Sequence, residues 1–549
     1  MFTRITSNGG RSYLQIMESY RNDEGKPRVR VVANLGRIDT MKEGQFDALI
    51  RGLSRVAGRP EPEKLEVAYE SALGFGDVFA LHELWKSLGF DRALGRGLRS
   101  GRRQIDVEAL VRAMVFNRLC DPASKLGCLR WLDTVALPNM PAKVEHHHLL
   151  RAMDALMDNV DRIEAELARQ IRPLVDHELT MVFYDLTTVR IHGEAKLEED
   201  LRAFGMNKEK GGIARQFVLG VVQTAEGLPL MHTVHPGNVS ETKTLQGMLA
   251  TVLERFPIQR IILVADRGLL SLDNIHHLTE MADQGARKLE FILAVPARRY
   301  GDLVETFRNF DFNGSDGLRE ASFEGHRLIV AHDAARALEQ GESRRARINE
   351  LEAMGNAMVA KLDRQDEGKS EKGRRASDRG AYSRFVRAIA DAELSRFVKA
   401  DLTADRFSWT VDEDAITQAA LFDGKLVLLT NVPGITPEDA VRKYKELGDI
   451  ERGFRILKSD IEIAPVHHRL PDRIRAHALI CFLALVLYRV MRMRLKAKGH
   501  SASPRAALDM LARIHRHRAK IADRKLEGIT TPTPEQLELF DTLNLPRPA

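Results

Sequence analysis

The sequence has little cysteine and no long hydrophobic run. Three cysteines (Cys120, Cys128 and Cys481) among 549 residues are too few for a disulfide framework, which indicates a reducing compartment. The most apolar run, 478–488, spans eleven residues, well short of the roughly 20 that cross a bilayer. The first ten residues lack the apolar segment of an export signal. We therefore expect a cytoplasmic protein with no membrane partner, and a buried helix at 478–488.

Repeats and strong compositional bias are also absent. The sequence shows no internal repeat and no long low-complexity tract, and 44% hydrophobic with 29% charged residues excludes collagen-like, disordered and membrane compositions. A domain usually takes about 100–200 residues. A chain of 549 residues is therefore expected to form several packed units, and a single small binding module is excluded.

The net charge of +6 is small, but the charge is unevenly placed along the chain. Residues 1–60 contain eleven basic and six acidic residues, and residues 489–525 contain twelve basic and two acidic residues. Five arginines also lie within 92–103. Such stretches suit a polyanion such as DNA, but charge runs are more often solvated surfaces, so both interpretations stay open.

The front of the chain is predicted to form two units. Strand-like alternation at Ser12–Arg21 and Pro27–Leu35, joined by a polar turn that contains Gly25, predicts a hairpin in a small β-module at 1–62. Helical spacing then predicts an all-helical unit at 63–175 for DNA binding or dimerisation. Its helices are expected around Val78–Leu88, Val107–Leu119, Lys125–Leu132 and His148–Leu167.

The segment 176–300 has three strand-like runs in sequence, followed by strands that alternate with helices. This order is the plan of a ribonuclease-H-like core, so we predict a multidomain α/β protein built on such a core. The expected elements are strands at Met181–Val189, Phe217–Gln223, Leu230–His235, Ile261–Ala265 and Phe291–Val295, and helices at 240–255 and Leu272–Met281.

A large insertion is expected at 301–425, before the closing helices of the core at 426–500 and a basic C-terminal tail at 501–549. The insertion contains a Gly/Ser/Lys/Arg-rich stretch at 365–383, whose composition predicts a mobile loop. The other expected elements are strands at Leu328–Ala331 and Phe407–Val411 and helices near Arg344–Leu362, at Pro437–Lys458 and at Arg475–Met491.

Two aspartates lie within or directly after apolar strand-like segments, where a buried carboxylate needs a cation or hydrogen-bond donors as partners. Asp185 lies inside the apolar strand-like segment 182–188, where an unpaired carboxylate is costly. Asp266 follows the apolar run 261–265, at the end of a predicted strand where α/β sheets usually place ligands. Separately, each could be structural, as a salt-bridged acid or a turn residue. Together they indicate a metal site, because Mg²⁺ prefers carboxylate oxygens and two such ions about 3.5–4 Å apart support phosphodiester chemistry.

The predicted helix after the insertion offers the third acid. Glu446, Asp449 and Glu451 are the candidates, and Glu451 is favoured because at about 100° per residue it shares a face with a tyrosine and two cations. The alternative is an ordinary surface ion pair between Glu451 and Arg455, worth a few tenths of a kcal/mol. The residues on or near this face are Tyr444, Leu447, Glu451, Arg455 and Lys458.

These residues resemble the motifs of a known family. Tyr444, Glu451 and Lys458 are similar in type and spacing to the Tyr-Arg-Glu-Lys signature of a large superfamily of bacterial insertion-sequence DDE transposases. Asp185 in Tyr-Asp-Leu-Thr-Thr and Asp266 in Val-Ala-Asp-Arg-Gly resemble the family's first and second acidic motifs, in the same order.

The resemblance extends over most of the chain and departs from the signature at one position. Leu447 stands where the signature has arginine, and Arg455 is the residue that could substitute for it. Further blocks similar to those of the family are Val32–Arg37, Phe204–Lys208, His235–Asn238 and Glu535–Leu537.

The resemblance implies a metal-dependent catalytic centre. Asp185, Asp266 and Glu451 would be the catalytic and metal-binding residues and would hold two Mg²⁺ ions, with Mn²⁺ as a substitute. The DNA-binding residues expected from the resemblance and from the C-terminal charge are Tyr444, Arg455, Lys458, Arg513, Arg516 and Arg518.

The implied activity is that of a transposase, which cuts DNA at the ends of its element and joins the freed 3′-hydroxyl to target DNA. Its partners would be the double-stranded DNA of the ends and of the target, and it would act as a homodimer because two ends must be held together. A bacterial, nucleoid-associated location in the cytoplasm follows from this activity. The alternatives are a ribonuclease-H-like nuclease or junction resolvase, and an inactive transposase-derived DNA-binding protein.

Weaker candidates have structural explanations. Three consecutive histidines, 146–148, point in different directions on a helix and are better read as a helix start than as metal ligands. His467–His468 and His477 near Cys481 are weak evidence for zinc. Trp409 could stack on a flipped base, but a strand tryptophan that serves packing is the more frequent case. The cysteines are expected to be small buried hydrophobes.

Overall fold

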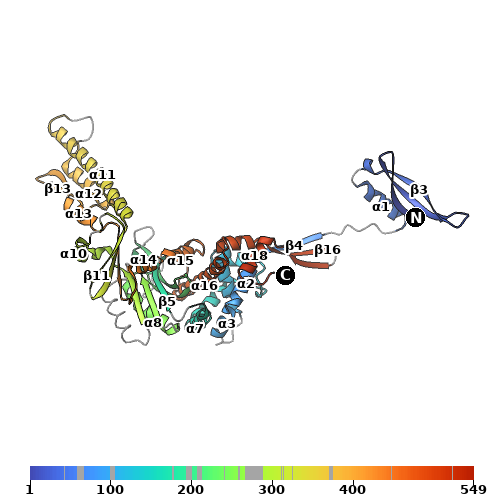
Figure 1. Cartoon of the computed structure of the whole chain (residues 1–549), viewed down its shortest axis with the longest axis horizontal. Helices are drawn as coiled ribbons and strands as arrows, with labels where there is room; N and C mark the ends of the chain where they lie inside the picture. The colour runs from blue at the N-terminus through green and yellow to red at the C-terminus, as the bar shows by residue number, and fades with distance from the viewer. Residues whose placement is uncertain are drawn as a thin grey trace. The chain divides into compact units, whose positions relative to one another are not determined.

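The computed structural model describes most of the chain in two compact units, one of Met1–Ser71 with His517–Gly528 and one of Ala72–Arg516 with Ile529–Ala549 (Figure 1). For some residues within helices and strands, including Asp185 and Glu451, the backbone alone is described. The described residues are 1–41, 44–58, 67–98, 105–175, 179–192, 201–206, 213–239, 241–256, 260–265, 288–310, 312, 314–323, 325–369, 375–446, 448–521 and 524–548.

The N-terminal unit begins with an antiparallel sheet of order β1-β2-β3, formed by Phe2–Asn8, Arg11–Arg21 and Pro27–Arg37. The predicted hairpin is confirmed: the Lys26 amide donates to the Asn22 side chain at 2.8 Å, and Gly25 takes a φ of 75°, which glycine adopts without strain. The sequence did not predict β1 or helix α1 (Gln45–Val56). A second sheet has the order β17-β16-β4, with β4 at Val67–Gly74, β16 at His515–Ile521 and β17 at Arg524–Ile529.

The helical spacing predicted between 76 and 171 is confirmed by the described helices, but the unit predicted to be all-helical at 63–175 also contains strand β4. Their core includes Trp85 and Phe116, whose ring centroids lie 5.9 Å apart. The helix predicted at 148–167 is in fact two helices, because the chain breaks at Asp158 and Asn159, and the Asn159 side chain donates to the free carbonyl of Ala155 at 3.0 Å. The helices are α2 (Gly76–Ser87), α3 (Phe90–Gly97), α4 (Val107–Cys120), α5 (Lys125–Leu132), α6 (His146–Met157) and α7 (Val160–Ile171).

A mixed sheet forms the centre of the second unit. The described strands have the order β11-β12-β15-β10-β9-β5-β7-β6, and β8 pairs with β7. β5 runs parallel to β9 and antiparallel to β7, and β9 runs parallel to β10. The strands are β5 (Leu179–Arg190), β6 (Phe204–Met206), β7 (Ile213–Thr224), β8 (Pro229–Pro236), β9 (Arg260–Ala265), β10 (Lys288–Ala294), β11 (Gly317–Phe323), β12 (His326–His332) and β15 (Lys425–Thr430).

The strands predicted for the core are confirmed as β5, β7, β8, β9 and β10, and the predicted helix at 240–255 is confirmed as α8 (Glu241–Arg255). The helix predicted at 272–281 lies outside the described residues. β5, β7, β9 and β10 were predictable because each contains an apolar run that is buried on both faces of the sheet, whereas β8 is fully buried only over 229–231.

The segment expected to be an insertion is only partly separate from the sheet. β12 pairs with β15 and β11 pairs with β12, so both strands extend the main sheet, and the part of this segment that is separate from the sheet begins after β12 rather than at 301. A separate core gathers around Phe385 and Phe407, whose rings lie 5.5 Å apart. The remaining elements of this region are α10 (Val304–Arg308), α11 (Ala334–Asp366), α12 (Asp378–Asp391), β13 (Val398–Thr403), β14 (Arg406–Val411) and α13 (Glu413–Ala420).

The stretch 365–383 is not the continuous loop that composition predicted. Ser377 caps the start of α12, which buries Ala381 against the separate core, and the Ala376 amide donates to the Gln365 side chain at 3.1 Å. A few contacts with the rest of the structure therefore order both ends of this polar stretch. Residues 370–374 lie outside the described residues.

The C-terminal part closes the structure and is not a tail. Leu539, Phe540 and Leu543 are fully buried in the main core, so the prediction of a basic tail at 501–549 is wrong. Apolar residues spaced among the basic ones cause this folding. The elements are α14 (Pro437–Lys445), α15 (Gly448–Ser459), α16 (Pro471–Ala497), α17 (Pro504–Leu511) and α18 (Pro534–Thr542).

Helix α16 contains the apolar run 478–488, whose burial is confirmed. Among the described helices, α16 alone is long and apolar enough to cross a membrane, and 94% of its most apolar window is buried inside the structure.

Candidate active site

The backbone of β5 places Asp185 in the middle of the sheet. Asp185 pairs with Val221 of β7, and the preceding residue, Tyr184, pairs with Ala265 of β9. Ala265 is the last described residue before Asp266, which lies outside the described residues. The described part of β9 therefore ends at Ala265, one residue before Asp266. Ala265 pairs with Tyr184, which is the residue directly before Asp185.

Tyr184 fixes this part of β5 to the helix layer. Its side chain is fully buried, and its hydroxyl donates to Oγ1 of Thr244 in α8 at 2.9 Å. Gly220 of β7 makes room for the ring, because a Cβ at Gly220 would lie 2.8 Å from it. β5 is therefore held by backbone hydrogen bonds to β7 and β9 and by the side-chain hydrogen bond from Tyr184 to α8.

The helix that carries Glu451 is shorter than the sequence predicted. The expected helix at 437–458 is two helices, since α14 ends at Lys445 and α15 begins at Gly448. The face deduced by counting about 100° per residue from Tyr444 to Glu451 therefore crosses a break and does not hold as one face. Within α15, Glu451, Arg455 and Lys458 keep the i, i+4, i+7 spacing of a common face.

Gly453, which the sequence did not single out, positions α15. This helix packs against β5 and α16. A Cβ on Gly453 would lie 2.8 Å from Nε2 of Gln223 and 3.1 Å from a guanidinium nitrogen of Arg489. Gln223 is fully buried and Arg489 is 3% exposed, so neither can move away easily. A glycine inside an amphipathic helix was the available signal of this close approach.

The residues expected to contact DNA phosphates have different surroundings. Tyr444 is half-buried and packs against the cluster beneath α14, which includes Phe183 and Val264 of the sheet. Arg455 is exposed and Lys458 is half-buried, on the side of α15 away from its buried residues. The structure therefore places Arg455 and Lys458 on one helix and Tyr444 on another.

The predicted C-terminal DNA-binding residues lie at the start of a strand. Arg513 precedes β16, and Arg516 and Arg518 are exposed on β16, alternating with half-buried neighbours. Lys520 continues the same exposed side. Arg518 also forms a salt bridge with Glu527 of β17 at 2.8 Å.

The weaker candidates have structural roles. His146–His148 begin α6, as expected, and the His148 side chain completes its capping box with Glu145. Trp409 lies against Gly355 of α11, where a Cβ would come within 2.5 Å of the indole nitrogen, and its ring lies 5.9 Å from that of Phe385. Among the cysteines, Cys128 and Cys481 are buried, whereas Cys120 is half-buried.

The described side chains include no group of three or more histidines, cysteines or acids that could hold a metal. The side chains of Asp185, Asp266 and Glu451 are not among those described. Their chemistry is what a hard divalent cation requires: three carboxylates.

This mixed α/β architecture carries the sequence signals of a class of proteins that process DNA. Residues 177–487 match the family described as the transposase DDE domain, and residues 2–64 match the N-terminal domain of IS1634 family transposases. The chain belongs to the DDE transposases of insertion sequences.

Other comparisons add little. The comparison with curated proteins gave no match. Among solved structures, the chain is similar to the Drosophila P element transposase strand transfer complex, at 11% identity over 75% of this chain and 97% of that chain, with a TM-score of 0.22. A TM-score this low supports no structural argument.

Proposed function

We propose that this transposase cleaves DNA at the ends of its element and transfers the freed 3′-hydroxyl into target DNA, with Asp185, Asp266 and Glu451 as its catalytic residues. The observation that carries this proposal is the register of β5 and β9, which pairs Tyr184 with Ala265, the residues directly before the two aspartates. Helix α15, which carries Glu451, packs against β5 and thus approaches the same strand.

The strand order supports a ribonuclease-H-like core. β8-β7-β5-β9-β10 has three antiparallel strands in chain order followed by two parallel ones, with β5 in the middle. By strand alternation, position 185 belongs to the same face as Phe183, which α14 covers. We assign the Tyr-Arg-Glu-Lys signature to Tyr444, Leu447, Glu451 and Lys458, with Leu447 replacing the arginine.

The donor set fits a divalent metal. Asp185, Asp266 and Glu451 would hold Mg²⁺, or Mn²⁺, through carboxylate oxygens. When bound, two such ions supply Lewis acids that favour the attacking and leaving oxygens of a phosphodiester. Arg455 and Lys458, on the same face of α15 as Glu451, would hold DNA phosphates beside the reacting group.

The proposed reaction has two balanced displacements. In the first, a water oxygen bonds to phosphorus at the element end, the bond from phosphorus to the 3′-oxygen breaks, and the released 3′-oxygen takes a proton. In the second, that 3′-hydroxyl attacks a target phosphodiester, loses its proton and displaces the target's own 3′-oxygen. No oxidant, reductant or nucleotide is consumed.

The test is an incubation of the full-length protein and Mg²⁺ with DNA that carries the element's ends and with a supercoiled target. Nicks at the ends together with joined products support the proposal. Nicks without joined products, when pre-cut ends are also supplied, would instead establish a nuclease or resolvase. End binding without any nick in Mg²⁺ or Mn²⁺ would establish an inactive DNA-binding protein.

We also propose that the protein acts as a homodimer on DNA, within the nucleoid of a bacterial cytoplasm. A symmetric dimer presents two equivalent sites to the two ends of one element. Measurement of the mass of the protein in complex with end DNA tests the dimer, and one protomer per pair of ends would contradict it.

A further inference from the structure

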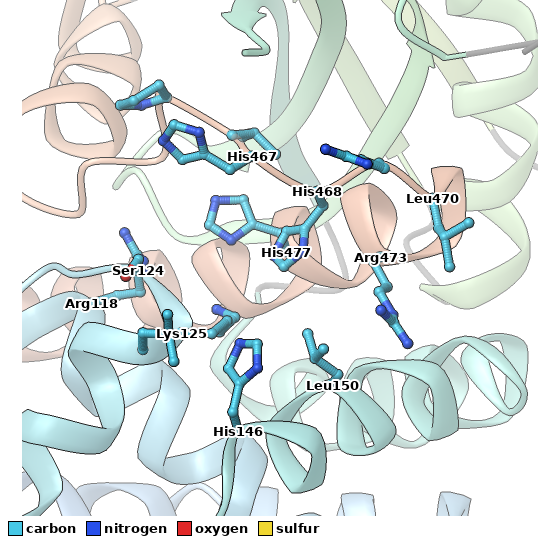
Figure 2. Close-up of a pocket in the computed structure, with 14 residues that line it drawn as sticks. Arg118, Ser124, Lys125, His146, Leu150, His467, His468, Leu470, Arg473 and His477 are labelled. Carbon is cyan, nitrogen blue, oxygen red and sulfur yellow. The ribbon is translucent and has the colours of Figure 1, made fainter. Parts of the chain in front are cut away.

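A cavity of about 350 Å³ lies where three helices begin (Figure 2). Its walls come from the end of α4 and the start of α5, from the start of α6, and from the segment 465–470 with the start of α16. Figure 2 shows basic side chains from these elements directed toward a common space. The charged and titratable residues that line it are Arg118, Lys125, His146, His467, His468, Arg469, Arg473 and His477.

The lining is positively charged, and three of its basic or titratable side chains are buried. Arg118 and Lys125 are each 6% exposed and His477 is 4% exposed. None of the described lining residues is an aspartate or a glutamate. Arg473 pairs with a carboxylate outside the lining, since it donates to Asp154 at 2.8 and 2.9 Å. Buried cations normally need an anion close by, and the described lining provides none for Lys125.

Two buried nitrogen atoms in this wall have no hydrogen-bond partner among the described residues, namely Nε of Arg118 and Nδ1 of His477. The other nitrogen atoms of these two side chains have hydrogen-bond partners. Arg118 donates to the carbonyl oxygens of Glu462, at 3.1 Å, and Ala123, and Nε2 of His477 lies 3.0 Å from the carbonyl oxygen of Ile463. Buried polar atoms without a partner are rare in native proteins, and the unpartnered donor, Nε of Arg118, points to a ligand that accepts hydrogen bonds.

The surrounding charges change the titration of the lining. Burial, and then the charge of Arg118, lowers the pKa of Lys125 to about 8. Burial and the charges of Lys125, Arg473 and Arg118 lower the pKa of His468 to about 4, and similar causes hold the pKa of His477 well below its usual range. These shifts come first from burial and then from the neighbouring positive charges.

We propose that this cavity binds a phosphate group. Lys125 and the Nε of Arg118 supply the direct donors, and the start of α5, which is capped by the neutral Ser124, adds the positive end of one helix. His477 carries its proton on the nitrogen that faces Ile463, so Nδ1 becomes a second donor only when the ring takes up a proton.

The position of the cavity relates it to the proposed active site. Val466, in the cavity wall, pairs with Ile191, and its carbonyl oxygen accepts from the His192 amide at 2.9 Å. Ile191 lies six residues beyond Asp185 along the same chain, a distance of about 20 Å in extended backbone. DNA advances about 3.4 Å per nucleotide. A DNA strand that ran along β5 from Asp185 would reach this cavity about six nucleotides away, which rests on the proposed function.

The phosphate group that binds in the cavity could be free phosphate or a phosphate of the DNA backbone. An experiment with two arms distinguishes these two ligands. The first arm follows thermal unfolding of the full-length protein in phosphate and in chloride at equal ionic strength, without divalent metal. We expect phosphate to raise the unfolding temperature of the wild type, and Lys125→Met to weaken phosphate binding by about tenfold. Methionine keeps the length of the side chain and removes a buried charge, so the variant should fold at least as well as wild type.

The control is Lys143→Met, which alters an exposed lysine outside the cavity lining that pairs with Glu145. It should keep the phosphate response. A purely structural role for Lys125 would change stability in phosphate and in chloride equally, and that result would contradict the proposal.

The second arm, which rests on the proposed function, measures binding of end DNA against salt, again without metal. If the phosphate comes from DNA, Lys125→Met lowers the slope of log affinity against log salt by about one, and free phosphate competes with the DNA. If the slope is unchanged but phosphate still stabilises the wild type, the ligand is free phosphate. If phosphate stabilises wild type no more than chloride and the slope is unchanged, the proposal is overturned. Since neither arm measures cleavage, failure of the catalytic proposal would leave this result intact.

Discussion

At the scale of single residues, the three proposed catalytic carboxylates and the half-buried His468 give the sharpest predictions. Glu451→Gln keeps the size of the side chain and removes the negative charge that a metal ion needs. We expect cleavage of end DNA to fall by roughly a hundredfold or more, with binding of the same DNA nearly unchanged. Asp185→Asn and Asp266→Asn should be equally inactive, and double variants no worse, because the three acids act as one unit.

The matched control is Glu446→Gln. Glu446 is the C-cap of α14 and lies on the other side of the break from Glu451, so its variant should keep most of the activity. Near wild-type nicking by Glu451→Gln in Mg²⁺ would contradict the assignment, as would an inactive Glu446→Gln.

His468 should make stability depend on pH. Its folded pKa of about 4 lies below the ordinary value of 6.5, so the unfolded chain binds more protons between these values. Stability from this group is therefore fully present above about pH 6.5, declines as the pH falls toward 4, and is constant below that. Relative to His468→Gln, the wild type should lose about 1–3 kcal/mol across this window. Denaturant unfolding of both proteins at pH 7.5 and 4.5 checks this, and equal losses would contradict it.

At the scale of single elements, the contact of α15 with the sheet decides where Glu451 lies. Gly453→Ala would push its Cβ against Gln223 and Arg489, which are buried. We expect a loss of about 1–3 kcal/mol in stability and a fall in cleavage rate that exceeds any loss of DNA binding. Gly247→Ala in α8 is the control, because a Cβ there meets nothing within 4 Å. It should be neutral or slightly stabilising, and an equal effect of both variants would count against a positioning role for Gly453.

Among the single elements, we expect β16 to bind DNA through its exposed side. Charge reversal at Arg513, Arg516 and Arg518 should weaken binding of end DNA and lower its salt slope by about 0.9 for each phosphate that the protein no longer neutralises. Reversal of Glu527, the partner of Arg518, to lysine should leave affinity unchanged or increase it. Fluorescence anisotropy at several salt concentrations measures both, and an unchanged slope in the triple variant would show that β16 does not contact DNA.

At the scale of the whole molecule, the C-terminal segment completes the main core. Phe540 is fully buried, and its ring lies 6.0 Å from that of Phe79 in α2, more than 400 residues earlier in the chain. We expect Phe540→Ala to cost about 3–5 kcal/mol of stability. Deletion of residues 531–549 should be at least as damaging. Urea unfolding tests both, and a deletion variant of unchanged stability would contradict the burial of α18.

The sequence by itself determined the strands of the core and predicted which acids would be catalytic. β5, β7, β9 and β10 contain apolar runs with a clear beginning and end, because a strand buried on both faces tolerates few polar residues. Asp185 was conspicuous for the same reason, as a charge within such a run. These signals are local, and local signals can be read from neighbouring residues.

Only the tertiary structure decided which distant segments meet. β12 joins the sheet beside β15, almost a hundred residues later, and α18 returns to the core near α2. The break between α14 and α15 depends on what each helix packs against, the sheet for α14 and both β5 and α16 for α15. The phosphate-binding cavity joins Arg118 and Lys125 to His468 and His477, more than 340 residues apart, and no spacing within the sequence encodes that meeting. Its charge and its unpartnered nitrogens exist because packing removed these groups from water.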